Sequence, residues 1–201
     1  MVKYKLNYFD VAGRAEPIRL LFHYNNQPFE DFRFKKDEWP KIKSKYIFGK
    51  VPVLEVDGKQ LAQSGAILQF LGKKFGLSGK NEWEEAKATE IIFLCDEMGY
   101  TIEPYIDAKF GFREGNEKLR KDVFLPAIER YFPIYEKRLE ESNSGFILPS
   151  GLSFVDFSVA HLIKMMNEME KDLKFKYPKL VDYSKRFYSL PQLKEYLKIK
   201  I

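Results

Sequence analysis

The chain has 201 residues, of which 45% are hydrophobic and 16% aromatic, and this composition excludes a disordered or low-complexity protein. The first residues lack the apolar segment of a signal peptide, and no run of about 18 apolar residues could cross a membrane. We therefore expect a cytoplasmic protein without membrane insertion. A single cysteine, Cys95, excludes an internal disulfide, and the absence of a Cys/His cluster predicts no metal site.

The net charge of +5 is concentrated in the first part of the chain. Residues 1–80 contain 15 Lys or Arg against 8 Asp or Glu, whereas the remainder is slightly acidic. No dense basic stripe or RNA-binding signature accompanies this charge, so we expect no nucleic-acid partner. A small anionic ligand bound by the first part would fit the charge, and so would an ordinary solvated surface.

The first 76 residues predict alternating strands and helices. Residues 2–8 alternate apolar and polar side chains, as a half-buried strand does, and residues 14–22 have helical periodicity. A weaker strand follows at 32–34, and the turn signal Asp57-Gly58 joins two further strands. Ser64 is placed to cap another helix, which completes a small α/β domain of order βαβαββα.

The rest of the chain predicts a second domain that is entirely helical. Residues 77–81 are polar and contain glycine, as linkers do. Residues 82–201 show helical periodicity and no convincing strand. Within them, Ser153 and Asp156 have the spacing of a capping box that starts a helix.

Four segments give the chain a resemblance to one protein family. They are Tyr8–Arg19, Phe48–Leu54, Gln63–Ile67 and Phe154–Phe157. In this order and at this spacing they resemble the cytosolic glutathione S-transferases across essentially the whole chain. Tyr8 followed by Gly13-Arg14-Ala15-Glu16 is most similar to the sigma class, an invertebrate detoxification type related to glutathione-dependent prostaglandin D synthase. The resemblance implies a thioredoxin-like N-terminal domain, glutathione as co-substrate and no tightly bound cofactor.

The resemblance makes Tyr8 the catalytic hydroxyl. A thiol is mostly protonated at neutral pH although the thiolate is the nucleophile, and a hydroxyl that donates to the sulfur lowers the thiol's pKa. Tyrosine suits this role because its own pKa of about 10 keeps the proton on oxygen. Arg14 would add positive potential near the sulfur. The alternatives are a buried structural tyrosine and an ordinary surface arginine.

The same resemblance assigns the other parts of glutathione to several short segments. The residues that it implies are Trp39, Lys43, Gly49, Lys50, Val51, Pro52, Gln63, Ser64 and, reaching across a homodimer, Asp96. Trp39 and Lys43 would hold the glycyl carboxylate through an indole N–H and a positive charge. Packing for Trp39 and plain solvation for Lys43 are the alternatives.

The cysteinyl and γ-glutamyl parts would meet backbone groups. In the family the bond before Pro52 is cis and the backbone of Val51 binds the cysteinyl part, although the sequence does not reveal the isomer. Ser64 begins a helix whose N-terminal N–H groups and dipole favour the γ-glutamyl carboxylate, with Gln63 beside it. Ser64 would also suit an ordinary N-cap, and the two roles are compatible.

The partner subunit and the electrophile complete the expected site. Asp96 would reach the α-amino group of the glutathione in the other subunit of a homodimer, unless it is simply an exposed helix residue. The electrophile pocket is expected beside Tyr8, facing the helical domain. Its candidate walls are Phe9, Met98, Gly99, Ile102 and Ile199. Pro104 and the segment Cys95–Glu97 depart from the prostaglandin-isomerising pattern and weigh against a dedicated prostaglandin D synthase.

We therefore expect a glutathione transferase that conjugates glutathione to small hydrophobic electrophiles in detoxification. The alternatives within the family are glutathione-dependent prostaglandin isomerisation or peroxide reduction. A third alternative is a non-catalytic carrier of haem and other hydrophobic anions.

Overall fold

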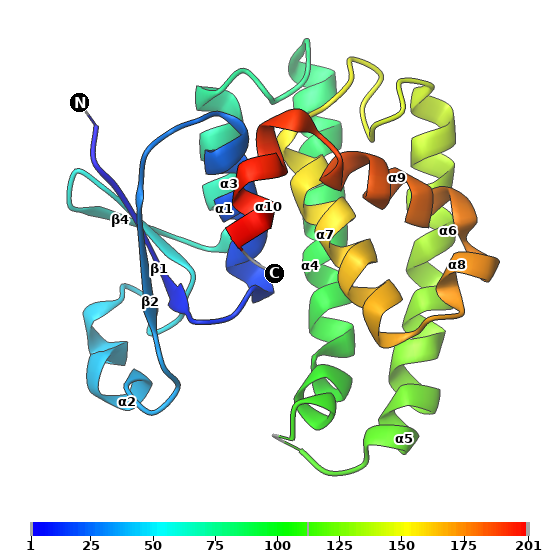
Figure 1. The fold of residues 1–201 in the computed structure, drawn as a ribbon, viewed down its shortest axis with the longest axis horizontal. Coiled ribbons are helices and arrows are strands. Elements are labelled where there is room, and N and C mark those ends of the chain that lie inside the picture. Colours follow the sequence, from blue (N-terminus) through cyan, green and yellow to red (C-terminus); the bar gives the residue numbers. More distant parts are fainter. Residues whose placement is uncertain (1, 112, 200–201) are drawn as a thin grey trace. The chain divides into compact units, whose positions relative to one another are not determined.

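The computed structural model describes residues 2–111 and 113–199, and the chain divides into two compact units (Figure 1). One unit comprises Met1–Ser78 with Arg186–Ile201, and the other comprises Gly79–Lys185. The division after Ser78 falls inside the predicted linker. The final segment, which the sequence places in the helical domain, groups with the first unit because Leu193 and Tyr196 are buried against that unit's first helix. Helical periodicity predicts a helix but not the surface on which it packs.

The first unit is built on a mixed sheet with the strand order β2-β1-β3-β4. Strand β1 (Tyr4–Phe9) is parallel to β2 (Glu30–Phe34) and antiparallel to β3 (Val53–Val56), which pairs antiparallel with β4 (Lys59–Ala62). Asp57-Gly58 joins β3 to β4 with both φ angles positive, at 49° and 81°, as a two-residue hairpin turn requires. The predicted order βαβαββα is confirmed.

Four helices and three short turns complete the described part of this unit. They are α1 (Glu16–Tyr24), α2 (Trp39–Ile42), α3 (Ser64–Lys74) and α10 (Lys194–Ile199), with short 3-10 turns at Gly13–Ala15, Lys43–Lys45 and Pro191–Leu193. Helix α1 packs against α3, and its side chains Ile18, Leu20, Leu21 and Phe22 are fully buried. Pro17 is tolerated because it stands in the first turn, where its missing N–H costs no helical bond.

The second unit is helical throughout its described elements. These are α4 (Glu82–Lys109), α5 (Asn116–Leu119), a π-turn at Arg120–Phe124, α6 (Leu125–Ser142), α7 (Phe154–Met169), α8 (Leu173–Lys176) and most of α9 (Pro178–Tyr188). Asn81 caps α4 by accepting the backbone N–H of Glu84 at 3.0 Å. Helices α4 and α7 pack together. Because every described element of this unit is a helix, the predicted all-helical second part is confirmed. None of the helices in the described part is long and apolar enough to span a membrane.

Helix α7 starts with the predicted capping box. The carboxylate of Asp156 accepts the backbone N–H of Ser153 at 2.8 Å and its hydroxyl at 3.0 Å. It also accepts the N–H of Ile147 at 2.9 Å and the hydroxyl of Tyr183 at 2.8 Å. Asp156, Ser153 and Tyr183 have no exposed surface, so one buried side chain ties the start of α7 to the preceding loop and to α9.

Candidate active site

Tyr8 lies near the end of β1 and is almost completely buried, with 8% of its surface exposed. Its hydroxyl oxygen accepts the backbone N–H of Arg14 at 3.2 Å. A hydroxyl that accepts a bond at oxygen still carries its own proton, and the accepted bond polarises the O–H toward a further acceptor. The geometry therefore makes Tyr8 a suitable hydrogen-bond donor to an anion.

Gly13 allows the backbone to approach the Tyr8 ring this closely. A Cβ atom at this position would lie 2.7 Å from the Tyr8 oxygen and 3.0 Å from Cε1, and the φ of Gly13 is +44°. Both the contact and the left-handed backbone favour glycine. The contact between Gly13 and the ring depends on the fold and is not visible in the sequence.

Arg19 on α1 is a functional candidate that the sequence reasoning missed. Its side chain has no exposed surface, and its guanidinium donates to the carboxylate of Asp31 at 3.0 Å and 3.1 Å. It also donates to the backbone carbonyls of Phe9, Val11 and Ala12 at 3.5, 2.8 and 3.3 Å, and to Glu16 at 3.4 Å. A lone charge inside an apolar run was the available signal, because a buried arginine must find acceptors. Three of these acceptors, the backbone carbonyls, lie between Tyr8 and Arg14.

Trp39 opens α2 and is held by aromatic neighbours. Its ring stacks on Phe34 at 5.6 Å and meets Phe9 edge-on at 5.4 Å. The residue is half-buried, so packing accounts for part of its surface. Lys43 follows in the adjoining turn and is exposed. A Cβ atom added to Gly49 would lie 3.2 Å from the Cε atom of Lys43, so the lysine side chain packs over Gly49. The φ of Gly49 is +55°.

The segment before β3 and the start of α3 contain two unusual backbone conformations. The Val51–Pro52 bond is cis, and Lys50 next to it is exposed. Gln63 has φ 72° and ψ 117°, a left-handed region that non-glycine residues rarely adopt and that occurs most often at functional sites.

The expectation that Ser64 caps α3 is wrong. Gln63 occupies the N-cap position and Ser64 is already the first helical residue. Within the described residues no side chain caps this helix, so its first-turn N–H groups do not receive the usual side-chain acceptor. An anion is the other kind of partner that suits a helix N-terminus.

The remaining candidates are divided between the two units. Asp96 and Gly99 on α4 are half-buried, whereas Met98 and Ile102 are fully buried. Phe9 is half-buried and Ile199 is 83% exposed, and both belong to the first unit. The electrophile pocket that the sequence assembles from these residues therefore stays a prediction.

Cys95 is not a nucleophile in this structure. Burial raises the pKa of its thiol to about 12, and the sulfur accepts the hydroxyl of Tyr135 at 3.6 Å. The protonated thiol is a packing group at neutral pH. In the described part of the chain, no three His, Cys, Asp or Glu side chains converge as a metal site would require.

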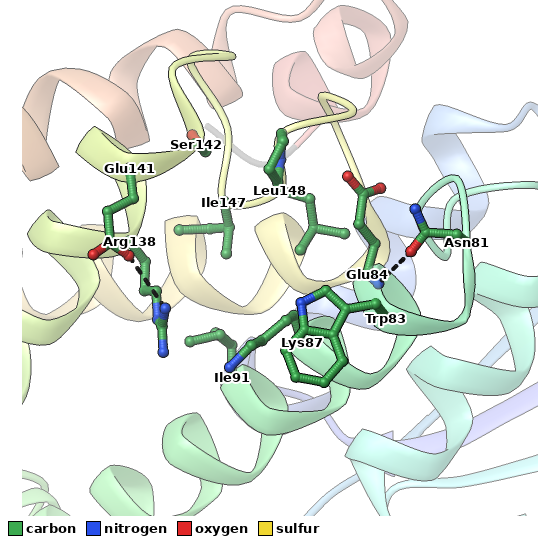
Figure 2. A pocket seen from close by; sticks show the side chains of 11 residues that line it. Asn81, Trp83, Glu84, Lys87, Ile91, Arg138, Glu141, Ser142, Ile147 and Leu148 are labelled. Carbon is green, nitrogen blue, oxygen red and sulfur yellow. Dashed lines mark hydrogen bonds and ion pairs between the residues drawn. The ribbon is translucent and has the colours of Figure 1, made fainter.

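A separate pocket of about 290 Å³ lies in the second unit, between α4, α6 and the loop before α7 (Figure 2). Its lining residues are Asn81, Trp83, Glu84, Lys87, Ile91, Arg138, Glu141, Ser142, Ile147, Leu148 and Pro149, none of which the sequence assigns to a site. Its cations are already paired, because Lys87 contacts Glu90 at 2.8 Å and Arg138 contacts Glu90 and Glu141 at 2.9 and 3.2 Å. Both cations of the lining are therefore engaged in ion pairs within the second unit.

Two family models match the chain. Residues 4–73 match "Glutathione S-transferase, N-terminal domain", and residues 101–200 match "Glutathione S-transferase, C-terminal domain". Among curated proteins, "Probable glutathione S-transferase 9" of Caenorhabditis elegans is 37% identical over 98% of this chain and 96% of its own length.

Solved structures resemble the chain over nearly its whole length. Monomeric Na-GST-3, a glutathione S-transferase of the hookworm Necator americanus, is 40% identical with a TM-score of 0.93, over 99% and 98% of the two chains. A Nu-class glutathione S-transferase of Haemonchus contortus is 39% identical, and a prostaglandin synthase D of Nilaparvata lugens is 34% identical. Each of these two has a TM-score of 0.87 over 98% and 97% of the two chains.

Proposed function

The chain belongs to the glutathione S-transferase family, and on this premise we propose that it conjugates reduced glutathione to small hydrophobic electrophiles, with Tyr8 as the catalytic hydroxyl. The observation that carries the proposal is the buried Tyr8 hydroxyl, whose oxygen accepts the N–H of Arg14 above Gly13. This bond fixes the hydroxyl and polarises its proton toward an acceptor, which in the proposed complex is the glutathione sulfur.

The proposed chemistry needs few groups. Donation from Tyr8 to the sulfur stabilises the thiolate, so the thiol proton leaves to solvent near neutral pH. The sulfur electron pair then forms a carbon–sulfur bond, and any leaving group of the electrophile departs with its bonding pair. Arg14 adds positive charge next to this position. The protein supplies thiolate stabilisation and orientation, which together account for the acceleration.

We propose that the remaining glutathione groups bind the other side chains of the first unit. The exposed ammonium of Lys43 and the accessible part of Trp39 would take the glycyl carboxylate. Gly49, Lys50, Val51 and Pro52 would border the cysteinyl part. The N-terminus of α3, with Gln63 and Ser64, would take the γ-glutamyl carboxylate, which its uncapped first turn supports.

The oligomeric state is a separate proposal. We propose a homodimer in which Asp96 approaches the glutathione of the other subunit. The relative at 40% identity is described as monomeric, so similarity alone does not decide the state. Light scattering during gel filtration separates the two, since the monomer mass is 23.8 kDa.

The class and the location are also proposals. We assign the sigma class on Tyr8 and the segment Gly13–Glu16, although a Nu-class enzyme is 39% identical to the chain. A cytoplasmic location would supply reduced glutathione and keep Cys95 reduced.

Prostaglandin isomerisation is the second candidate activity. The similarity to a prostaglandin synthase D favours it, and Pro104 and Cys95–Glu97 weigh against it. Product analysis after incubation with prostaglandin H and glutathione separates an isomerase from a conjugating enzyme.

The central experiment measures binding and conjugation with the purified chain. We expect retention on immobilised glutathione, elution by free glutathione, and turnover of an activated aryl halide that requires both enzyme and glutathione. Retention without turnover, together with haem binding, would favour the carrier alternative. Absence of both retention and turnover would contradict the proposal.

Replacing Gly13 with alanine tests the site geometry. The new methyl group would collide with Tyr8, so we expect the ring to shift and kcat/KM for conjugation to fall by about 10- to 100-fold. Gly58→Ala is a matched control, because Gly58 also has positive φ, at +81°, but no atom within 4 Å of an added Cβ. Both variants carry the backbone penalty. Equal activity losses would show that contact with Tyr8 is unimportant.

A further inference from the structure

The buried hydroxyl of Tyr196, near the C-terminal end of the first unit, contacts helix α1. The residue lies on α10 and is 7% exposed, and its hydroxyl donates to the carboxylate of Glu16 at 3.1 Å and 3.2 Å. Its ring stacks on His23 at 4.0 Å. Burial and the nearby charge of Glu16 raise the pKa of Tyr196, so the hydroxyl keeps its proton at neutral pH. The C-terminal helix is thus joined to α1 by a hydrogen bond and a ring contact.

Glu16 connects this hydroxyl to the buried guanidinium of Arg19. Glu16 is 2% exposed and contacts Arg19 at 3.4 Å, and Asp31 contacts the guanidinium from its other side at 3.0 Å. A buried carboxylate needs hydrogen-bond donors for its oxygens, and Tyr196 supplies one of them. The position of Arg19 therefore depends on two carboxylates, one of which is oriented by Tyr196.

Arg19 in turn holds the loop that carries the donor to Tyr8. Its guanidinium donates to the carbonyls of Phe9, Val11 and Ala12, which bracket the turn between Tyr8 and Gly13. The next residue, Arg14, donates its backbone N–H to the Tyr8 hydroxyl at 3.2 Å. A continuous set of buried and partly buried contacts thus links the C-terminal helix to the Tyr8 hydroxyl.

We propose that Tyr196 is a positioning residue for catalysis: through Glu16 and Arg19 it holds the loop whose Arg14 N–H orients the Tyr8 hydroxyl. The proposal rests on the proposed role of Tyr8. Without the Tyr196 hydroxyl, Glu16 and Arg19 settle into a looser arrangement and the Arg14 N–H contact lengthens. The bound thiolate then loses part of its stabilisation.

The test is the pKa of the glutathione thiol in its complex with the enzyme, measured by titrating the ultraviolet absorbance of the thiolate. We expect Tyr196→Phe, which keeps the ring, to raise this pKa by about half a unit, which lowers the thiolate fraction about threefold at pH values below it. Arg19→Lys keeps the charge but lacks the planar array of donors. We therefore expect it to raise the thiol pKa by about one unit, which lowers the thiolate fraction about tenfold.

Tyr183→Phe is the matched control. Tyr183 is also fully buried and donates to a buried carboxylate, Asp156 at 2.8 Å, but it lies in the second unit. We expect it to reduce stability and leave the thiol pKa unchanged. If Tyr196→Phe and Arg19→Lys behave in the same way, the network is a structural brace only and the positioning role is overturned.

A double variant separates this proposal from the role of Tyr8. If Tyr196 acts through Tyr8, adding Tyr196→Phe to Tyr8→Phe should leave the thiol pKa of the Tyr8→Phe enzyme unchanged. A further rise in the double variant would contradict action through Tyr8. If Tyr8→Phe alone leaves the thiol pKa at the wild-type value, the proposed function of Tyr8 fails, and the positioning role fails with it.

Discussion

Replacing Tyr8 with phenylalanine is expected to lower kcat/KM for conjugation near pH 7 by about 10- to 100-fold. A hydrogen bond to a charged group is worth about 1.5–3 kcal/mol, and each 1.4 kcal/mol is a factor of ten. The variant keeps the buried ring, its edge contact with Phe9 and the space next to Gly13, and it loses the donor to sulfur. Affinity for glutathione should change little, because the remaining groups of the tripeptide are bound elsewhere. The loss should diminish at high pH, where the thiol ionises without assistance.

Tyr4→Phe is the control on the same strand. Tyr4 is 4% exposed, and its buried hydroxyl has no hydrogen-bond partner among the described residues. Removing it should leave the rate and the thiol pKa at their wild-type values. A Tyr8→Phe enzyme with wild-type rates from pH 6 to 8 would assign Tyr8 to the core and move catalysis to another group.

The order of elements was predictable because local sequence patterns determine it. The alternation at 2–8 and the helical period at 14–22 locate β1 and α1 correctly. The fold buries both elements on more than one face, because Asn7 is 2% exposed and α1 is buried from Glu16 to Phe22. Asp57-Gly58 requires only local backbone freedom, and Ser153 and Asp156 satisfy each other within a single turn. Such features need no knowledge of distant contacts.

Long-range contacts account for what the sequence did not predict. Arg19 is separated by twelve residues from Asp31, and the hydroxyl of Tyr196 reaches Glu16 across 180 residues of chain. Ser64 has a good capping side chain, yet the left-handed backbone of Gln63 takes the cap position. The Tyr8 candidate came from a family resemblance, and the fold adds the reason that its hydroxyl is oriented.

The largest stability loss is expected at Asp156. Alanine there would remove the carboxylate that accepts from four buried donors of Ser153, Ile147 and Tyr183, and we expect the free energy of unfolding to fall by about 3–5 kcal/mol. Urea unfolding at fixed protein concentration measures this loss. Asp182→Ala is the control, because its exposed pair with Lys185 is worth at most about 1 kcal/mol. Equal losses in the two variants would contradict a special role for the buried carboxylate.

The stabilising effect of Asp156 should also depend on pH. Burial raises the pKa of Asp156 to about 6, above its usual value of 3.8, although its four donors lower it in part. The folded protein therefore binds a proton at Asp156 more tightly than the unfolded chain does. The resulting contribution to the free energy of unfolding is complete below about pH 4 and is lost as the pH rises through 6. Asp156→Asn does not titrate, so wild-type stability measured relative to this variant should decrease between pH 4 and pH 6. A difference that increases over this range would mean that the hydrogen bonds outweigh burial and that the carboxylate is held ionised.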